Sequence, residues 1–360
     1  MSHDVEKMMF TGKKQPWWYG NTSQGEAVGT FLGDDAVTSA QAIRAADLEW
    51  MALKRPAGYR YGETLYFKKP LWNEVEGECF LVRSSDGQFL GRCTEDYKEF
   101  QNSEAFEFLD ELVKDGDLLY HTAGSLGQGK RVWILAQTPI QWTIKKRSGK
   151  ENVHKAFINA MLGHTGNIGI SLLPTDVLVV CANTAGWADQ KAEGENLVFR
   201  ISHRGDIKKK LALAAHGLKV MQEQAPARRQ VLQAMAQAAM NNEEFIDFAT
   251  SIFLGLDGDA DEIEAGVAKF YEEATPRSKT IMENKVALVT QKFQEGIGND
   301  GDSMYDALNG FTEYFDHFDL DHIKDKIEKG KRAAKAVESS WVGAGAERKA
   351  LVYKRLKERL

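Results

Sequence analysis

The chain has 360 residues, 43% of them hydrophobic and 27% charged, and a formal net charge of −6 at pH 7. The length suggests about two domains, and the composition is that of an ordinary globular protein. No apolar run approaches the ~18 residues that span a bilayer, and the opening segment MSHDVEKMMF lacks the apolar region of a signal peptide. We therefore do not expect a membrane-spanning protein, and these features favour a cytoplasmic one.

Positive charge is concentrated in the middle of the chain. Residues 1–129 contain 13 Lys and Arg against 21 Asp and Glu, residues 130–219 contain 14 against 6, and residues 220–360 contain 19 against 25. The middle segment therefore has a net charge of +8 and is flanked by acidic segments. Such segregation permits local attraction of polyanions although the whole chain is acidic.

The first half of the chain predicts β-rich structure. Residues 77–97 form two alternating runs joined at Asp86 and Gly87, which is a typical hairpin signal. Residues 100–116 follow as a helix, and residues 118–140 predict a second pair of strands around a glycine-rich turn. We therefore predict an α+β domain in which a helix covers one face of a curved antiparallel sheet.

From about residue 206 the pattern becomes helical. Apolar residues recur at steps of three and four, as in one buried stripe: Ile207, Leu211, Ala214, Leu218 and Met221. Asp206 precedes this stripe and is the expected N-cap. Further helix-compatible segments follow, separated by Pro226, Pro276 and clusters of glycine or aspartate. We predict an α+β domain at residues 1–222 and an all-helical domain at residues 223–360.

Candidate sites for nucleotides, metals and catalysis do not emerge. The segment GHTGNIG (163–169) lacks the Lys–Ser/Thr pair of a Walker loop and the spacing of a dinucleotide site, which favours a bend between two strands. The segment DGDADE (257–262) has Ala268 where a calcium loop needs Glu, which favours a helix-capping turn. The acidic and aromatic segment EYFDHFDLDH (313–322) is typical of interhelical packing. We expect no catalytic residue, no metal and no cofactor, and therefore no enzyme.

The three cysteines, Cys79, Cys93 and Cys181, are odd in number and widely spaced. This spacing favours neither a disulfide framework nor a zinc site. We expect reduced thiols in the core.

Features of nucleic-acid binding are better supported. Residues 130–155 interleave cations with Trp133 and Trp142; cations attract phosphates, and exposed indole rings stack on unpaired bases. A second group of cations surrounds the expected helix start, where the helix dipole disfavours them and where a docked anion would reverse that cost. The predicted DNA-binding residues, with Trp142 as the stacking platform, are Lys130, Arg131, Trp142, Lys145, Lys146, Arg147, Lys150, Lys155, Arg200, Arg204, Lys208, Lys209 and Lys210. The alternative is that Trp133 packs in the core and that the lysines are solvated.

Several stretches carry a resemblance to a known family. They follow one another over most of the chain: MSHDVEKM, PWWYGN, EDYKEFQNSEAFEFLDELV, TAGSLGQGKRVWILA, VVCANT, SHRGDIKKKL, DALNGFTEYFDH and ESSWVGAGAERKA. In these the chain resembles the phage/plasmid-like protein family, which carries a domain of unknown function. That resemblance implies a function connected with phage or plasmid DNA in a bacterial host cell. The order hairpin–helix–hairpin is also similar to that of single-strand annealing recombination proteins, the RecT, Redβ and Erf group.

The leading hypothesis is a single-stranded DNA-binding and annealing protein of phage or plasmid recombination that works without ATP. In this hypothesis the β-rich domain forms a homo-oligomeric ring or filament, and the two basic stretches converge on one strand. The acidic helical region would recruit a phage or host replication or recombination protein. One alternative is a protein-interaction or self-assembly module without DNA binding. A second alternative is a metal-dependent enzyme acting on nucleotides or nucleic acid.

Overall fold

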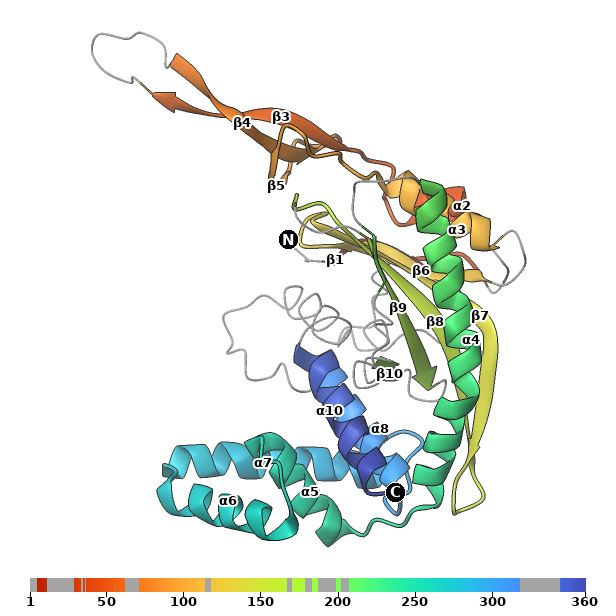
Figure 1. The fold of residues 1–360 in the computed structure, drawn as a ribbon, viewed down its shortest axis with the longest axis vertical. Helices are drawn as coiled ribbons and strands as arrows, with labels where there is room; N and C mark the ends of the chain where they lie inside the picture. Colours follow the sequence, from red (N-terminus) through yellow and green to blue (C-terminus); the bar gives the residue numbers. More distant parts are fainter. Residues whose placement is uncertain are drawn as a thin grey trace.

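The computed structural model describes residues 5–11, 29–33, 35, 37–61, 71–113, 118–166, 170–178, 183–186, 199–201, 207–317 and 344–360. In this part of the chain, strands form two sheets in the N-terminal half and helices form the C-terminal half (Figure 1). The predicted α+β class is confirmed.

The elements follow one another along the chain. The strands are β1 (Val5–Phe10), β2 (Thr30–Phe31), β3 (Ala52–Tyr61), β4 (Leu71–Arg83), β5 (Phe89–Thr94), β6 (Leu119–Leu126), β7 (Arg131–Lys145), β8 (Glu151–Gly163), β9 (Ile170–Leu178), β10 (Asn183–Gly186) and β11 (Phe199–Ile201). The helices are α2 (Ser39–Ala45), α3 (Asn102–Val113), α4 (Ile207–Gln237), α5 (Asn242–Leu254), α6 (Ala260–Glu273), α7 (Pro276–Glu295), α8 (Met304–His317) and α10 (Ala344–Glu358). None of these described helices combines the length and the hydropathy needed to cross a bilayer.

The larger sheet has the strand order β10-β9-β8-β7-β6-β1-β2, and β11 pairs with β9 on the same edge as β10. Its strands are antiparallel except for the parallel pair β1 and β2. Residues 132–136 of β7 and 156–163 of β8 are buried without alternation, because both faces of the sheet are covered at that level. The bend predicted at residues 163–169 does lie between β8 and β9.

The smaller sheet has the order β3-β4-β5 and extends away from the body of the molecule (Figure 1). We call this sheet the arm. Strand β4 contains a bulge. Between the pair Pro56–Cys79 and the pair Gly58–Glu74, β3 advances by two residues (56 to 58) but β4 spans five (74 to 79). Gly77, with a φ of 76°, adopts the left-handed backbone conformation within this bulge. Cys79 and Cys93 lie opposite each other on β4 and β5 and are buried and free, whereas Cys181 lies outside the described residues.

The hairpin predicted at Asp86 and Gly87 connects β4 to β5. Arg83 closes its turn by donating two hydrogen bonds to the Asp86 carboxylate, of 2.9 and 2.7 Å. The two predicted hairpins do not share one sheet, however, and that part of the prediction is wrong. The backbone at Gly91 of β5 packs closely against Thr165, so β5 meets the loop after β8 by close packing instead of joining the larger sheet.

Helix α4 begins at Ile207, where the apolar stripe predicted it, and continues to Gln237. The expectation that Pro226 separates two helices is wrong, because Pro226 lies inside α4. Proline removes one backbone hydrogen bond, but the buried Ala225, Arg228 and Leu232 hold the helix against its neighbours on both sides of that position. Residue 222 also lies inside α4, and the domain division at this residue stays a prediction.

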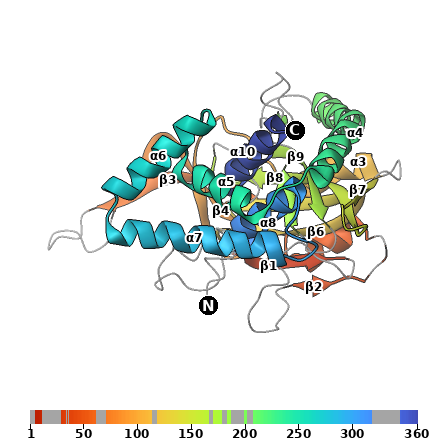
Figure 2. The same ribbon diagram turned by 90° about the horizontal axis from the view of Figure 1, so that it is seen from below.

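The remaining predicted helices are confirmed, and α8 is central among them (Figure 2). The predicted capping turn is present at α6, where Asp259 and Glu262 form a capping box. Helix α8 buries aromatic side chains and three acidic ones, and each acid pairs with a lysine from a different segment. The pairs are Asp306 with Lys146, Glu313 with Lys292 at 3.1 Å, and Asp316 with Lys349 at 2.7 Å.

Candidate nucleic-acid interface

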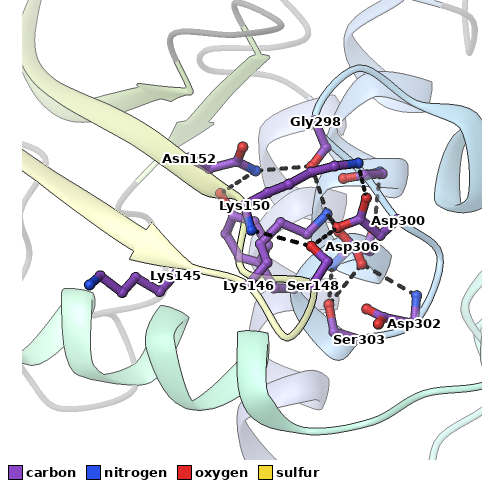
Figure 3. Close-up of polar contacts among 12 residues, drawn as sticks. Lys145, Lys146, Ser148, Lys150, Asn152, Gly298, Asp300, Asp302, Ser303 and Asp306 are labelled. Atoms are coloured by element: carbon purple, nitrogen blue, oxygen red, sulfur yellow. Dashed lines mark hydrogen bonds and ion pairs between the residues drawn. The ribbon is translucent and has the colours of Figure 1, made fainter.

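The turn between β7 and β8 carries the first predicted basic stretch, and Lys146 is buried at its start. Strand alternation places Lys146 on the same face as Trp142 and Ile144, which is the covered face. The Lys146 Nζ lies 2.8 Å from a carboxylate oxygen of Asp300 and 2.8 Å from one of Asp306 (Figure 3). The ammonium group also donates a hydrogen bond of 2.8 Å to the carbonyl oxygen of Gly298.

Asp300 receives further hydrogen bonds from the same turn (Figure 3). Lys150 Nζ and Ser148 Oγ both donate to its carboxylate, the latter at 2.6 Å. Burial alone would raise the pKa of Asp300, but the hydrogen bonds from Lys146, Lys150 and Ser148 lower this pKa below its usual value. Hydrogen bonding to Asp300 raises the pKa of Lys150 in turn. Asp300 is therefore an ionised partner of the turn at neutral pH.

Asp306 is fully buried at the first turn of α8. Its carboxylate accepts a hydrogen bond of 2.9 Å from Ser303 Oγ and one of 3.3 Å from the Asp302 backbone. Burial raises the pKa of Asp306, and the ammonium of Lys146 opposes this rise. Lys146 thus pairs with two aspartates of the helical region and fixes the turn to it.

The turn therefore offers less positive charge than its sequence indicates. The prediction that Lys146 contacts DNA is corrected, because its side chain is wholly buried between carboxylates. Lys150 is exposed, but it pairs with Asp300, as Lys146 does. Lys145 is exposed, and its Nζ lies 3.5 Å from a carboxylate oxygen of Glu151. Arg147 is exposed at the tip. Lys155, on β8, is half-buried and donates a hydrogen bond of 3.5 Å to Gln137.

Trp142 is not a platform for bases. Its side chain is only 5% exposed and stacks on His154, with ring centroids 5.8 Å apart and an interplanar angle of 5°. His154 Nε2 is in turn hydrogen-bonded to the hydroxyl of Tyr305 on α8, at 2.6 Å. The predicted stacking role of Trp142 is corrected, because its ring is buried against His154 on the one covered face of the sheet, where His154 is tied to α8. Trp133 is fully buried, as the alternative expected.

A second set of predicted cations lies at the other end of the larger sheet. Lys130 and Arg131 stand where β7 begins. The register aligns Trp133 of β7 with Met161 of β8, then Ser171 of β9 and Arg200 of β11. Arg200 is therefore three strands from the start of β7, or about 14 Å at the usual strand spacing.

Helix α4 starts close to this end of the sheet. Five residues lie between Ile201, the last residue of β11, and Ile207, so the distance between these two is at most about 20 Å. Lys208, Lys209 and Lys210 occupy the first turn of α4. Arg204 lies outside the described residues.

The two basic stretches do not converge. The backbone of Lys145 exchanges hydrogen bonds with Gln233 at 3.0 and 2.7 Å and accepts one from Gln237 at 2.8 Å, near the C-terminal end of α4. Lys208 is 25 residues before Gln233, which corresponds to about 37 Å along a helix. The turn and the helix start thus lie at opposite ends of α4 (Figure 1), and the expectation of one shared groove is wrong.

A protein-family profile described as a domain of unknown function (DUF932) matches residues 89–341, which is well over half of the chain. The chain belongs to this family. The DUF932 match begins at β5, so β3 and β4 both precede it, and it includes Lys146 together with both of its aspartates. No curated protein and no solved structure matches the chain significantly.

Metal ligands do not gather in the part of the chain that the structure describes. Within it, no group of three or more His, Cys, Asp and Glu side chains is arranged to hold a metal ion.

Proposed function

We propose that this DUF932 protein binds single-stranded nucleic acid, and DNA in particular, through one basic end of the larger sheet. The observation that carries the proposal is the sheet register, which aligns Arg200 of β11 with Trp133 near the start of β7. The short connection after β11 keeps the first turn of α4 within about 20 Å of Ile201. We call the set of cations at this end the sheet-end surface; its members are Lys130, Arg131, Arg200, Lys208, Lys209 and Lys210.

Helix energetics support an anionic ligand at the sheet-end surface. Lysines in the first turn of a helix are disfavoured by a few tenths of a kcal/mol each, because they face the positive end of the helix dipole. A phosphate docked there would meet the backbone N–H groups of the first turn, the dipole and the lysines together, so the sign of their interaction would change. Three consecutive lysines at this position are explained by such a ligand and not by helix stability.

Binding of a strand through its phosphates suits strand annealing without nucleotide hydrolysis. Cations bind the backbone regardless of sequence and leave the base edges free to pair with a second strand. With Trp142 buried, base stacking contributes nothing at that position, and electrostatics carries the binding. We therefore expect a strong salt dependence and little sequence preference.

Fluorescence anisotropy with a labelled oligothymidylate tests the proposal. The triple variant Lys208→Ala, Lys209→Ala, Lys210→Ala should weaken binding at low salt. It should also reduce the slope of log affinity against log salt by about 2, since each single-strand phosphate contact contributes about 0.7. The matched control Lys145→Ala, Arg147→Ala, Lys150→Ala removes the same charge at the other end of α4 and should bind like the unmodified protein.

Two results would overturn the proposal: absence of binding by the unmodified protein at low salt, or equal losses in the two triple variants. Annealing of complementary oligonucleotides without ATP is then measured by fluorescence transfer. It should fall with the sheet-end variant and persist with the control.

A second candidate function is a protein-interaction module. The observation that favours it is the arm, which exposes large apolar side chains.

A further inference from the structure

The two faces of the arm have different surroundings. On one face Cys79, Leu81 and Cys93 are buried, and the backbone of Gly91 packs against Thr165. Strand alternation places the neighbouring residues of each strand on the opposite face. We call this opposite face the pocket face; its side chains include Arg55, Tyr59, Val75, Phe80, Phe89 and Arg92.

The pocket face is hollowed and lined by aromatic side chains. A shallow pocket of about 400 Å³ is lined mainly by Tyr59, Val75, Phe80 and Phe89. Phe80 and Phe89 meet edge to face, with ring centroids 5.4 Å apart. Phe89 is 44% exposed and Tyr59 is 56% exposed, so both rings are open to a ligand. The pocket is therefore an apolar depression with aromatic walls, which suits a planar ring.

Arginines flank these aromatic side chains on the same face. The register places Arg55 of β3 and Arg92 of β5 directly opposite Phe80 of β4, one on each side. Arg92 pairs with Glu78 at 3.1 Å, and both side chains are partly exposed. Arg55 is exposed and forms no ion pair with another residue that the structure describes. Among the described residues of β3, β4 and β5, the pocket face thus carries two cations and one carboxylate.

The arm lies next to the sheet-end surface. The backbone of Gly91 in β5 packs against Thr165. The backbone N–H of the adjacent His164 donates a hydrogen bond of 2.8 Å to the carbonyl oxygen of Lys130, which belongs to the sheet-end surface. A single strand that is bound there by its phosphates can therefore continue onto the arm.

We propose that the pocket face binds unpaired bases of the single-stranded nucleic acid that the sheet-end surface holds by its phosphates. Aromatic side chains bind bases by stacking, and cations beside them bind the phosphates of the same strand. Such a ligand uses both the rings and the arginines of the pocket face, whereas an apolar segment of another protein would use only the rings. Stacking tolerates every base, so the sequence preference stays small. The inference rests on the proposed function.

Anisotropy with two labelled oligonucleotides of equal length tests the inference on the full chain. One is oligothymidylate, and the other has the same number of phosphates but abasic sites in place of the bases. The unmodified protein should bind oligothymidylate at least about fivefold more tightly, because stacking on one aromatic side chain has an effect of this size or larger. The double variant Tyr59→Ala, Phe89→Ala should lose this preference and keep its affinity for the abasic strand.

The opposite face of the arm supplies matched controls. Trp72 is 52% exposed and pairs directly with Arg60, so both lie on the face opposite to Tyr59. Trp72→Ala should keep the preference for oligothymidylate. Arg55→Ala should reduce the slope of log affinity against log salt by about 0.7, which corresponds to one phosphate contact, whereas Arg60→Ala should leave the slope unchanged.

Three outcomes decide between the two proposals. Equal affinities of the unmodified protein for the two oligonucleotides would overturn the inference and leave a protein partner on the arm. Equal losses in the double variant and in Trp72→Ala would overturn it as well. In both cases the proposed function stands if binding still depends on Lys208, Lys209 and Lys210. If the unmodified protein binds neither oligonucleotide at low salt, the inference and the proposed function fall together.

Discussion

Replacing Lys146 by methionine should destabilise the protein far more than its place in a surface turn suggests. The substitution keeps a side chain of similar length but removes the ammonium group between Asp300 and Asp306. Asp300 retains its hydrogen bonds from Lys150 and Ser148, so it stays partly compensated. Asp306 is fully buried and would retain no positive partner that the structure describes.

The size of the effect follows from this difference. Removing one partner of a buried ion pair costs about 3–5 kcal/mol, and we expect about 3 kcal/mol because only one of the two aspartates is stranded. The control Lys150→Met removes an ammonium that is 67% exposed and should cost far less, because solvent screens an exposed ion pair. Adding Asp306→Asn to Lys146→Met removes the stranded charge and should recover part of the loss.

Urea unfolding followed by circular dichroism measures these differences, at pH 7 and at pH 5. The pKa of Asp306 is already raised by burial and rises further without Lys146, so the folded variant takes up a proton more readily than its unfolded chain. The deficit of Lys146→Met should therefore shrink as the pH falls. Equal costs for Lys146→Met and Lys150→Met, or a deficit that grows at pH 5, would refute the reasoning.

Three further predictions concern other sites. Trp142→Ala should cost about 3–5 kcal/mol in unfolding free energy but leave the oligonucleotide affinity of the folded protein unchanged; weaker binding at equal folded fraction would restore its stacking role. Asp86 should titrate in NMR spectra with a pKa of about 2, because Arg83 donates hydrogen bonds to it. This pair's small contribution to stability should be complete above the usual value of 3.8 and be lost as the pH falls through about 2, and Arg83→Gln should return the pKa of Asp86 toward 3.8. Gly91→Ala would push a methyl group into the Thr165 backbone and should cost about 1–3 kcal/mol, seen as a lower thermal midpoint; an unchanged midpoint would show that β5 is not held there.

The parts of the fold that depend on a few adjacent residues could be predicted from the sequence. The turn at Asp86, the start of α4 at Ile207 and the cap at Asp259 depend on a few adjacent residues, and the structure agrees with each of them. The prediction that Pro226 separates two helices was wrong because a local rule for helix ends was outweighed by packing around that position, where Ala225, Arg228 and Leu232 are buried.

The candidate site was harder to predict because its decisive partners are remote. Lys146 looks like one more cation in a basic run, and its aspartates come more than 150 residues later. A local signal did exist: Lys146, the residue after β7, continues the alternation of Trp142 and Ile144, so a strand whose apolar residues face inward also turns Lys146 inward. The distance between the turn and the helix start depends on the length of α4. The prediction that a helix ends at Pro226 makes α4 too short, so the sequence could not give this distance.

One of the three lysine–carboxylate pairs of α8, Lys146 with Asp306, makes the helical half of the chain depend on the sheet half. One lysine comes from the β-hairpin turn and two come from neighbouring helices, so the acids of α8 are neutralised only when all three segments are present. A gene shuffled between relatives near residue 222 would join an acidic helix of one parent to a hairpin of the other. Such a hybrid remains stable only if the incoming hairpin supplies a lysine at the place of Lys146.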